Sequence, residues 1–291
     1  MTIGEALRRA ANKLKMSNIE TPAFEAGVIL CHVLNCDKTF IYSNSEDILD
    51  SRSAGVFSGL IDKRAERMPL QYITGKQEFM SLEFDVAPGI LIPRQDTEIL
   101  VEEVIQYSNS LNHNNRQIII LDIGTGSGCI GVSLAYYIQN SHVTALDISE
   151  NALGIARKNA QKHNVSANMS FVLAHITTAI KEWTIPEFDI VVSNPPYIPA
   201  KDIEALQPEV KGFEPLTALD GGDDGLDFYR IIVNGSPACL KPGGLLAFEV
   251  GKGQSGDVSR LMERYYSDIR IVKDLSGIER VVMGRLRKQS L

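Results

Sequence analysis

The sequence predicts an α/β protein in which a largely parallel, doubly wound sheet at residues 94–291 follows a smaller helical region. From residue 117 onward, short apolar runs typical of strands alternate with helical stretches. Before residue 70, apolar residues instead recur at helical spacing. The predicted strands span 118–123, 142–147, 169–174, 188–193, 245–251, 269–273 and 281–286. No helical stretch separates the last two, so we expect them to form an antiparallel hairpin at the end of the sheet.

The first part of the chain, residues 1–70, is predicted to be a small helical domain. Thr2 and Glu5 have the spacing of a capping box, and Thr21 precedes a proline, as an N-cap residue often does. A third helix is expected around Val56. No chemistry is visible here, so we expect this domain to bind or orient a partner.

Residues 71–93 change to an alternation of apolar and polar side chains. An alternating run at 82–86 and a second apolar run at 90–92 flank the turn signal Pro88-Gly89. We therefore expect a β-hairpin connector between the two domains.

Composition narrows the class of protein. The chain has 291 residues, of which 44% are hydrophobic and 22% charged, as in ordinary globular proteins. Its formal charge of −7 argues against broad phosphate contacts with duplex nucleic acid. No apolar run is long enough to span a bilayer, and the N-terminus lacks a signal-peptide pattern. The four cysteines form no CxxC pair, which favours free thiols in a reducing cytoplasm over disulfides or zinc.

The motif "LDIGTGSGCIG" places Asp122 at the tip of a strand and several glycines before a helix. Glycines here permit a tight turn and let a ligand lie against bare backbone. Gly126 to Gly131 also fits the dinucleotide fingerprint, which alone is weak evidence for NAD. An acid before the glycines suits the cationic methionine part of S-adenosylmethionine better than a pyrophosphate. Asp147, at the end of the next strand, can bind ribose hydroxyls or simply cap the following helix.

A second motif, Asn194-Pro195-Pro196-Tyr197, ends the strand at 188–193. Two prolines stop the ladder and stiffen the loop, at the sheet edge where open α/β sheets bind ligands. The nitrogen of a planar, conjugated NH2 group is a poor nucleophile. An Asn oxygen and a backbone carbonyl can accept its N–H bonds and aim it at a sulfonium methyl. Tyr197 can stack on the planar group.

Further motifs lie on either side of these two. They are "PLQYI" from Pro69, Gly75, "LIPRQDTE" from Leu91, "FEP" from Phe213, "GGDDGLDFYR" from Gly221 and "FEVG" from Phe248, with Gln254, Gly277 and Arg280. On these residues the chain resembles, along nearly its whole length, the protein-(glutamine-N5) methyltransferases of peptide chain release factors, the PrmC/HemK family. The Asn-Pro-Pro-Tyr motif alone is shared with adenine-N6 methyltransferases.

The resemblance implies a Rossmann-like, seven-stranded methyltransferase domain that uses S-adenosylmethionine, releases S-adenosylhomocysteine and needs no metal. The implied acceptor is the side-chain amide of the glutamine in the Gly-Gly-Gln loop of class-I release factors, in support of translation termination. No membrane or stable nucleic-acid binding is expected. The residues implied to bind the cofactor are Gly124, Thr125, Gly126, Ser127, Gly128, Asp147 and Asn194. Asn194 is also implied to contact the acceptor, with Pro195, Pro196 and Tyr197 forming the glutamine pocket.

Three departures from the family pattern stand out. The family usually has Arg-Pro-Glu-Thr-Glu where this chain reads Arg-Gln-Asp-Thr-Glu at 94–98, and we expect the helix start to survive because Asp and Thr cap well. His175-Ile176 replaces an Asp and a large apolar residue near the adenine, so a carboxylate hydrogen bond is lost. The loop through Trp183 is longer than usual.

Three hypotheses compete for the function. Glutamine methylation of release factors is favoured by the full-length resemblance. Adenine-N6 methylation of DNA or RNA also acts on a flat NH2 group, but it calls for phosphate contacts that the acidic composition disfavours. An NAD-dependent oxidoreductase, or a domain that binds a nucleoside without catalysis, leaves the Asn-Pro-Pro-Tyr motif unexplained.

Overall fold

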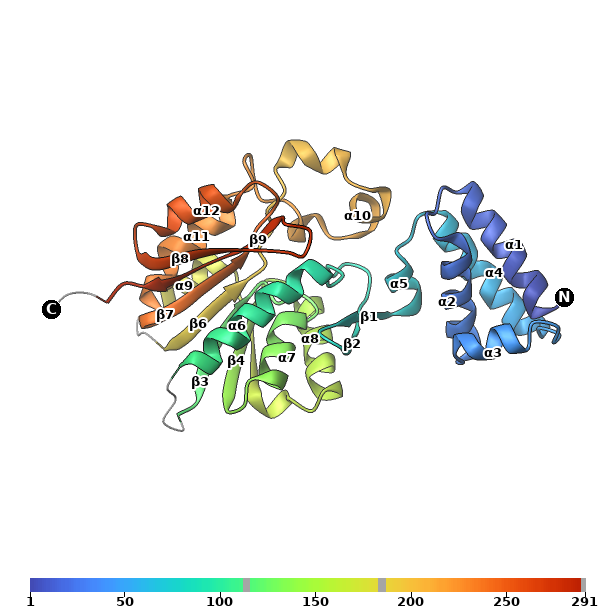
Figure 1. Ribbon diagram of the computed structural model, residues 1–291, viewed down its shortest axis with the longest axis horizontal. Coiled ribbons are helices and arrows are strands. Elements are labelled where there is room, and N and C mark those ends of the chain that lie inside the picture. Colours follow the sequence, from blue (N-terminus) through green and yellow to red (C-terminus); the bar gives the residue numbers. More distant parts are fainter. Residues whose placement is uncertain (112–115, 183–186, 289–291) are drawn as a thin grey trace. The chain divides into compact units, whose positions relative to one another are not determined.

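The computed structural model describes residues 1–111, 116–182 and 187–288 (Figure 1). The chain divides into two compact units. The helical unit comprises Met1–Lys76 together with Leu206–Phe213. The sheet unit comprises Gln77–Ala205 and Glu214–Leu291. In the sequence, residues 206–213 lie between the two segments of the sheet unit, but they pack with the N-terminal helices.

The helical unit buries one apolar cluster among its helices. The cluster lies among α1 (Ile3–Met16), α2 (Pro22–Leu34), α3 (Lys38–Ser43), α4 (Ser51–Ala65) and α5 (Leu70–Thr74). The helix α10 (Pro208–Phe213), from later in the chain, belongs to the same unit but contributes no residue to the cluster. The predicted capping box of Thr2 and Glu5 is confirmed. The predicted N-cap at Thr21 with proline in the first turn is confirmed, although the Thr21 hydroxyl makes no cap hydrogen bond and donates to the Glu25 carboxylate at 3.3 Å. The two short helices α3 and α5 were missed, since neither is long enough to display a helical period.

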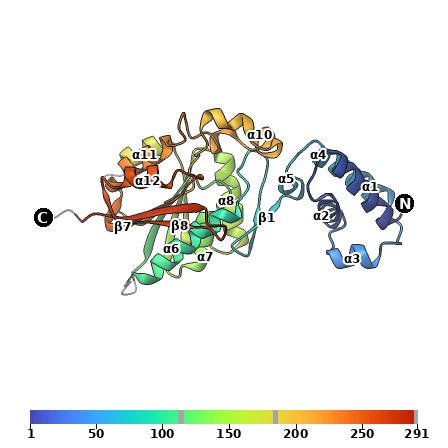
Figure 2. The same ribbon diagram turned by 45° about the horizontal axis from the view of Figure 1, so that its top comes forward.

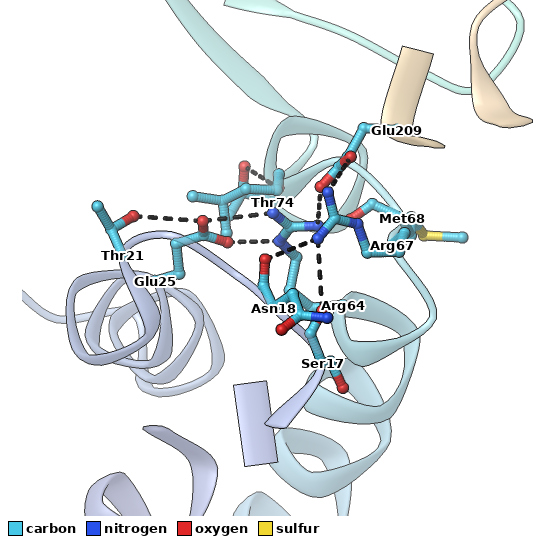
Figure 3. A network of polar contacts seen from close by, with 10 residues as sticks. Ser17, Asn18, Thr21, Glu25, Arg64, Arg67, Met68, Thr74 and Glu209 are labelled. Atoms are coloured by element: carbon cyan, nitrogen blue, oxygen red, sulfur yellow. Dashed lines mark hydrogen bonds and ion pairs between the residues drawn. The ribbon is translucent and has the colours of Figure 1, made fainter. Parts of the chain in front are cut away.

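A buried ionic network joins α2, α4 and α10 within this unit (Figure 3). The Arg64 guanidinium hydrogen-bonds both carboxylate oxygens of Glu25, and its Nη1 donates to Glu209 at 3.2 Å. Arg67 donates to the other Glu209 oxygen at 2.7 Å. Burial alone would lower the pKa of Arg64, but the two carboxylates outweigh it and raise the pKa. The network therefore holds α10 to the N-terminal helices.

The expected β-hairpin is present, but its turn lies elsewhere. The two strands are β1 (Lys76–Phe79) and β2 (Leu82–Asp85), which form a two-stranded sheet. Met80 and Ser81 make the turn with φ of 50° and 57°. The predicted turn at Pro88-Gly89 is present, with Gly89 at φ 84° and a hydrogen bond from the Ile90 N–H to the Ala87 carbonyl at 3.2 Å. The predicted return strand at 90–92 is wrong, so this turn does not close the hairpin. The hairpin turn itself was missed because a two-residue turn with positive φ is usually signalled by Asn-Gly, and Met-Ser gives no such signal.

The sheet unit contains a seven-stranded sheet in the order β5-β4-β3-β6-β7-β9-β8. Its five parallel strands are β3 (Ile118–Ile123), β4 (Ser141–Asp147), β5 (Met169–Leu173), β6 (Phe188–Ser193) and β7 (Leu240–Glu249). The strands β8 (Tyr266–Lys273) and β9 (Glu279–Leu286) pair antiparallel, as predicted. The α/β class and the seven predicted strands are thus confirmed.

Helices cover both faces of this sheet. One face packs against α6 (Glu98–Ser110), α7 (Cys129–Tyr137) and α8 (Glu150–Lys162), and the other against α9 (Ile176–Glu182), α11 (Asp227–Gly235) and α12 (Ser255–Met262). Figure 2 shows α11 and α12 above the strands and α6 and α7 below them. Neighbouring residues of the central strand β6 point to opposite clusters, so both faces of the sheet are buried.

Candidate active site

A cavity of about 440 Å³ opens at the carboxyl ends of the central parallel strands, within the sheet unit. It is the place where an open α/β sheet binds ligands, because the chain order reverses there. Strand β3 has β4 on one side and β6 on the other, so both predicted motifs end at this edge. The predicted residues that line it are Gly124, Thr125, Gly126, Ser127, Asp147, Asn194, Pro195 and Pro196.

The glycine loop connects β3 to α7 in a conformation that demands glycine. Gly124, Gly126 and Gly128 have φ of 72°, 56° and 82°. An added Cβ at Gly124 or Gly126 would meet no atom within 4 Å, so bare backbone faces open space. At Gly128 it would come within 3.0 Å of Ala156 on α8. Gly128 is not among the residues that line the cavity, and its role is close packing against α8.

Asp147 ends β4 beside this loop. Its carboxylate accepts hydrogen bonds from the backbone N–H groups of Gly126 and Ser149, at 2.9 Å each. The second contact belongs to the start of α8, so the carboxylate stabilises the loop and the helix start together. Each carboxylate oxygen has a further lone pair for a ligand. Burial raises the pKa of Asp147, against these backbone hydrogen bonds.

Asp122 hydrogen-bonds groups of the glycine loop and α7 and does not line the cavity. Its Oδ2 accepts from the Thr125 hydroxyl at 2.6 Å and from the Gly131 N–H at 3.0 Å. The residue is fully buried and does not line the cavity. Burial raises its pKa to about 7. The expectation that this acid faces a cationic ligand directly therefore needs correction, because the turn folds the carboxylate inward, under the glycines.

The Asn-Pro-Pro-Tyr loop leaves β6 with its Asn side chain tied to the start of α6. The Nδ2 of Asn194 donates to Thr97 Oγ1 at 3.2 Å. No described residue donates a hydrogen bond to the Oδ1 at the other end of this amide. Pro195 and Pro196 line the cavity, whereas Tyr197 does not. The Tyr197 hydroxyl points instead toward Glu249, at 3.4 Å from Oε1.

Residues far along the chain immobilise this loop, and the sequence reasoning missed them. Gln254 Nε2 donates to the Tyr197 carbonyl at 2.8 Å. An added Cβ on Gly225 would lie 2.3 Å from that same carbonyl oxygen, and one on Gly221 would lie 2.9 Å from the Pro196 oxygen. Gly221 and Gly225 of the "GGDDG" segment therefore need to be glycine because they pack directly on the loop backbone, a signal available in the motif itself.

A fully buried acid, Glu249, lies at the end of β7, next to the Asn-Pro-Pro-Tyr loop. Burial raises its pKa to about 7, while a hydrogen bond from the Thr97 side chain and the positive charge of Arg280 oppose the rise. The Tyr229 hydroxyl donates to its backbone carbonyl at 2.8 Å. Glu249 belongs to the "FEVG" motif, but the sequence alone does not predict which groups it contacts.

Two ion pairs flank the start of α6. Arg94, which lines the cavity, pairs with Glu214, whose side chain is 1% exposed. Burial raises the pKa of Glu214, against the attraction of Arg94. Asp96 pairs with Arg280 at 2.6 Å, so the shortened acid still reaches a cation. A short 3-10 turn (Gln95–Thr97) precedes α6, so the helix start survives, although the Thr97 side chain does not cap it.

The departure at His175-Ile176 lies at another wall of the cavity. Both residues line it, and Ile176 is buried. The His175 ring Nδ1 lies 2.7 Å from the Thr177 hydroxyl, at the start of α9. This wall is apolar at Ile148 and Ile176 and carries no carboxylate at 175. The longer loop at Trp183 lies outside the described residues.

Within residues 1–111, 116–182 and 187–288, no His, Cys, Asp or Glu cluster has a metal-binding arrangement. In the same ranges, no helix is long and apolar enough to cross a bilayer.

Comparison with known families gives matches over both units. The family described as the PrmC N-terminal domain matches residues 5–75, and a methyltransferase domain family matches residues 114–249. The release factor glutamine methyltransferase of Geobacter sulfurreducens is 41% identical over 98% of this chain and 97% of its own length. The protein of the same name from Clostridium acetobutylicum is 40% identical over 98% of each chain.

Among solved structures, the hMettl16 catalytic domain in complex with MAT2A 3′UTR hairpin 6 is similar, with a TM-score of 0.55. It is 16% identical, and the match covers 83% of this chain and 84% of that one. At that level of identity the likeness concerns the fold alone.

Proposed function

Because the chain belongs to the family of release factor glutamine methyltransferases, we propose that it methylates the side-chain amide nitrogen of the glutamine in the Gly-Gly-Gln loop of a peptide chain release factor. The observation that carries the proposal is that a single cavity joins the glycine loop to Asn194. A cofactor site and an acceptor-orienting amide therefore lie within reach of one another.

The residues of the cavity fit S-adenosylmethionine. Bare backbone at Gly124 and Gly126 lets a ligand approach closely, and Asp147 offers lone pairs suited to ribose hydroxyls. Ile148 and Ile176 offer apolar surface for a base. When bound, the cofactor supplies an electrophilic methyl group on a sulfonium.

The acceptor amide needs orientation more than it needs a base. Its nitrogen lone pair is delocalised into the carbonyl, so the nitrogen is a weak nucleophile until its N–H bonds are engaged. Asn194 Oδ1 can accept one N–H, and a carbonyl of the rigid Pro195-Pro196 segment can accept the other. These two hydrogen bonds would hold the acceptor nitrogen in line with the methyl–sulfur bond, and such orientation lowers the barrier to transfer. The surplus proton leaves after transfer, so no base is assigned to the transfer step.

Labelled-methyl transfer tests the proposal. Purified enzyme and labelled S-adenosylmethionine are incubated with a release factor, and in parallel with duplex DNA and with structured RNA. We expect label on the release factor alone. A release factor with Gln→Ala in its Gly-Gly-Gln loop is the matched control and should remain unlabelled. Label on DNA or RNA alone would overturn the proposal in favour of an adenine acceptor, and equal labelling of the Gln→Ala factor would exclude that glutamine.

A further inference from the structure

The side-chain amide of Asn194 has two ends of nearly equal shape, and only one can accept a hydrogen bond from an acceptor NH2 group. The contact to Thr97 Oγ1 does not by itself decide which end faces the cavity, because a hydroxyl can donate as well as accept. A third group must fix the direction of the Thr97 hydroxyl hydrogen.

Glu249 is placed to do this. Strands β6 and β7 run parallel with Ser193 opposite Phe248, so Asn194 and Glu249 follow at neighbouring strand ends. Thr97, from the start of α6, accepts from Asn194 Nδ2 at 3.2 Å, and its hydroxyl lowers the pKa of Glu249, whose buried Oε2 has no other hydrogen-bond partner among the described residues. Thr97 is 2% exposed and Glu249 1% exposed, so water does not compete for these contacts. The order Glu249, Thr97, Asn194 thus forms a short buried chain of polar groups.

We propose that Thr97 and Glu249 are positioning residues that set the rotation of the Asn194 amide, so that Oδ1 rather than Nδ2 is presented to the acceptor nitrogen. The inference rests on the proposed function for the identity of the acceptor, but the orientation itself is a property of the chain.

The charge of Glu249 decides which groups donate and which accept in the series Glu249, Thr97, Asn194. An ionised carboxylate only accepts, so the Thr97 hydroxyl donates to it, and the Thr97 lone pairs accept from Asn194 Nδ2. A protonated Glu249 can donate to Thr97, which frees the Thr97 hydrogen to turn toward Asn194. The amide then loses its preferred rotation, and a share of molecules presents Nδ2 to the acceptor.

Groups from every neighbouring element influence that charge. Asp96 and the Tyr197 hydroxyl lie near it from the start of α6 and from the Asn-Pro-Pro-Tyr loop, and Arg280 lies near it from β9. Tyr229 on α11 and Cys129 on α7 also face it. Arg280 favours the ionised form and Asp96 opposes it. Arg280 is itself paired with Asp96, which reduces its effect on Glu249.

Conservative substitutions at Thr97 test the inference kinetically. Thr97→Val keeps the shape and removes the hydroxyl, and we expect kcat to fall about 10- to 100-fold as the acceptor loses alignment. The affinity for S-adenosylmethionine, measured by calorimetry, should stay nearly unchanged. Thr97→Ser restores the hydroxyl and should recover most of the rate. Thr144→Val on β4 is the matched control and should not change kcat, because no hydrogen bond of the Thr144 hydroxyl supports the site.

Glu249→Gln tests the charge. A neutral amide can donate as well as accept, so we expect a lower kcat and loss of the acid limb that the wild-type rate should show below about pH 7. Wild-type rates for Thr97→Val, equal damage by Thr97→Val and Thr97→Ser, or an unchanged acid limb in Glu249→Gln would each overturn the inference. Each of these three outcomes is compatible with glutamine methylation by the wild-type enzyme. Failure of this inference can therefore be told apart from failure of the proposed function.

A second measurement does not depend on activity. The side-chain NH2 signal of Asn194, assigned by nuclear magnetic resonance as the signal lost in Asn194→Asp, should shift with pH as Glu249 titrates. The shift should vanish in Glu249→Gln and in Thr97→Val. A signal that keeps its pH dependence in both variants would contradict the buried chain, whichever substrate the enzyme uses.

Discussion

The acids of the helical unit's polar network are paired with arginine, whereas the sheet unit buries both paired acids, such as Glu214 with Arg94, and unpaired ones. In the helical unit, the acids Glu25 and Glu209 contact the guanidinium of Arg64. In the sheet unit, Asp122 and Glu249 are fully buried, and among the described residues neither forms an ion pair. The pKa of Glu209 is lowered, because its own backbone and the two arginines outweigh burial, whereas burial raises the pKa of Asp122 and of Glu249 to about 7.

This difference separates two uses of a buried charge. A paired acid holds its neighbours in place and stays ionised, as suits an anchor between α10 and the N-terminal helices. An unpaired acid costs stability when ionised, and that cost is tolerated where the group orients a site. Asp122 orients the glycine loop through its hydrogen bond from the Gly131 N–H. Glu249 lies at the end of β7, next to the strand end that Asn194 follows.

The largest expected effect on stability comes from breaking the paired network. Arg64→Met leaves Glu25 buried without its cation, and we expect the free energy of unfolding to fall by about 3–5 kcal/mol. Urea denaturation followed by far-ultraviolet circular dichroism measures this. Adding Glu25→Leu to Arg64→Met should recover much of the loss, because an apolar pair replaces the stranded charge.

Lys13→Met is the matched control, since Lys13 pairs with Asp62 on the surface with half of each side chain exposed. Its expected change is below about 1 kcal/mol. Equal losses for Arg64→Met and Lys13→Met would show that burial does not distinguish the two ion pairs.

The next effect concerns rate rather than stability. Asn194→Ala removes the amide that receives the acceptor, and we expect methyl transfer to slow by about 10²-fold or more. Because Asn194 is only half-buried, its loss should leave the urea midpoint nearly unchanged. Initial-rate assays beside urea titration separate the two quantities. Transfer at the wild-type rate would show that Asn194 does not orient the acceptor.

A smaller effect follows from the unpaired acid. The pKa of Glu249 is about 7 in the folded chain, against a usual value of 4.5. A raised pKa contributes stability fully below about pH 4.5, and this contribution is lost as the pH rises through about 7. Between pH 5 and 8 the wild type should therefore lose roughly 2–3 kcal/mol relative to Glu249→Gln, which does not titrate. Parallel pH dependences in urea denaturation would contradict the unpaired burial of Glu249.

Much of the fold could be predicted from the sequence because apolar residues recur at helical spacing before residue 70 and form short strand-like runs from residue 117 onward. The strands of the parallel sheet are short apolar runs bounded by turns, and each lies within a few residues of its predicted range. The hairpin turn at Met80-Ser81 escaped prediction because positive φ there is imposed by strand pairing and not by residue type.

The site was predictable only in part. The residues that line the cavity lie in two contiguous motifs at strand ends, where chemistry and position can be read together. The partners behind them are distant in sequence, as with Asn194 and Thr97, which lie 97 residues apart. A hydrophobic period indicates which face of an element is buried, but it does not say which polar atoms meet across elements. For this reason the sequence predicts a helix cap at Thr97, whereas in the structure the Thr97 hydroxyl accepts a hydrogen bond from Asn194.

The most direct test of the account is to locate the methyl group. A release factor is incubated with the wild-type enzyme and S-adenosylmethionine, digested, and its Gly-Gly-Gln peptide fragmented by tandem mass spectrometry. We predict the mass of one methyl group on the glutamine side chain, and none when Asn194→Ala replaces the wild type over the same time. A methyl group on another residue, or none on the peptide while a nucleic acid becomes methylated, would contradict glutamine methylation in this cavity.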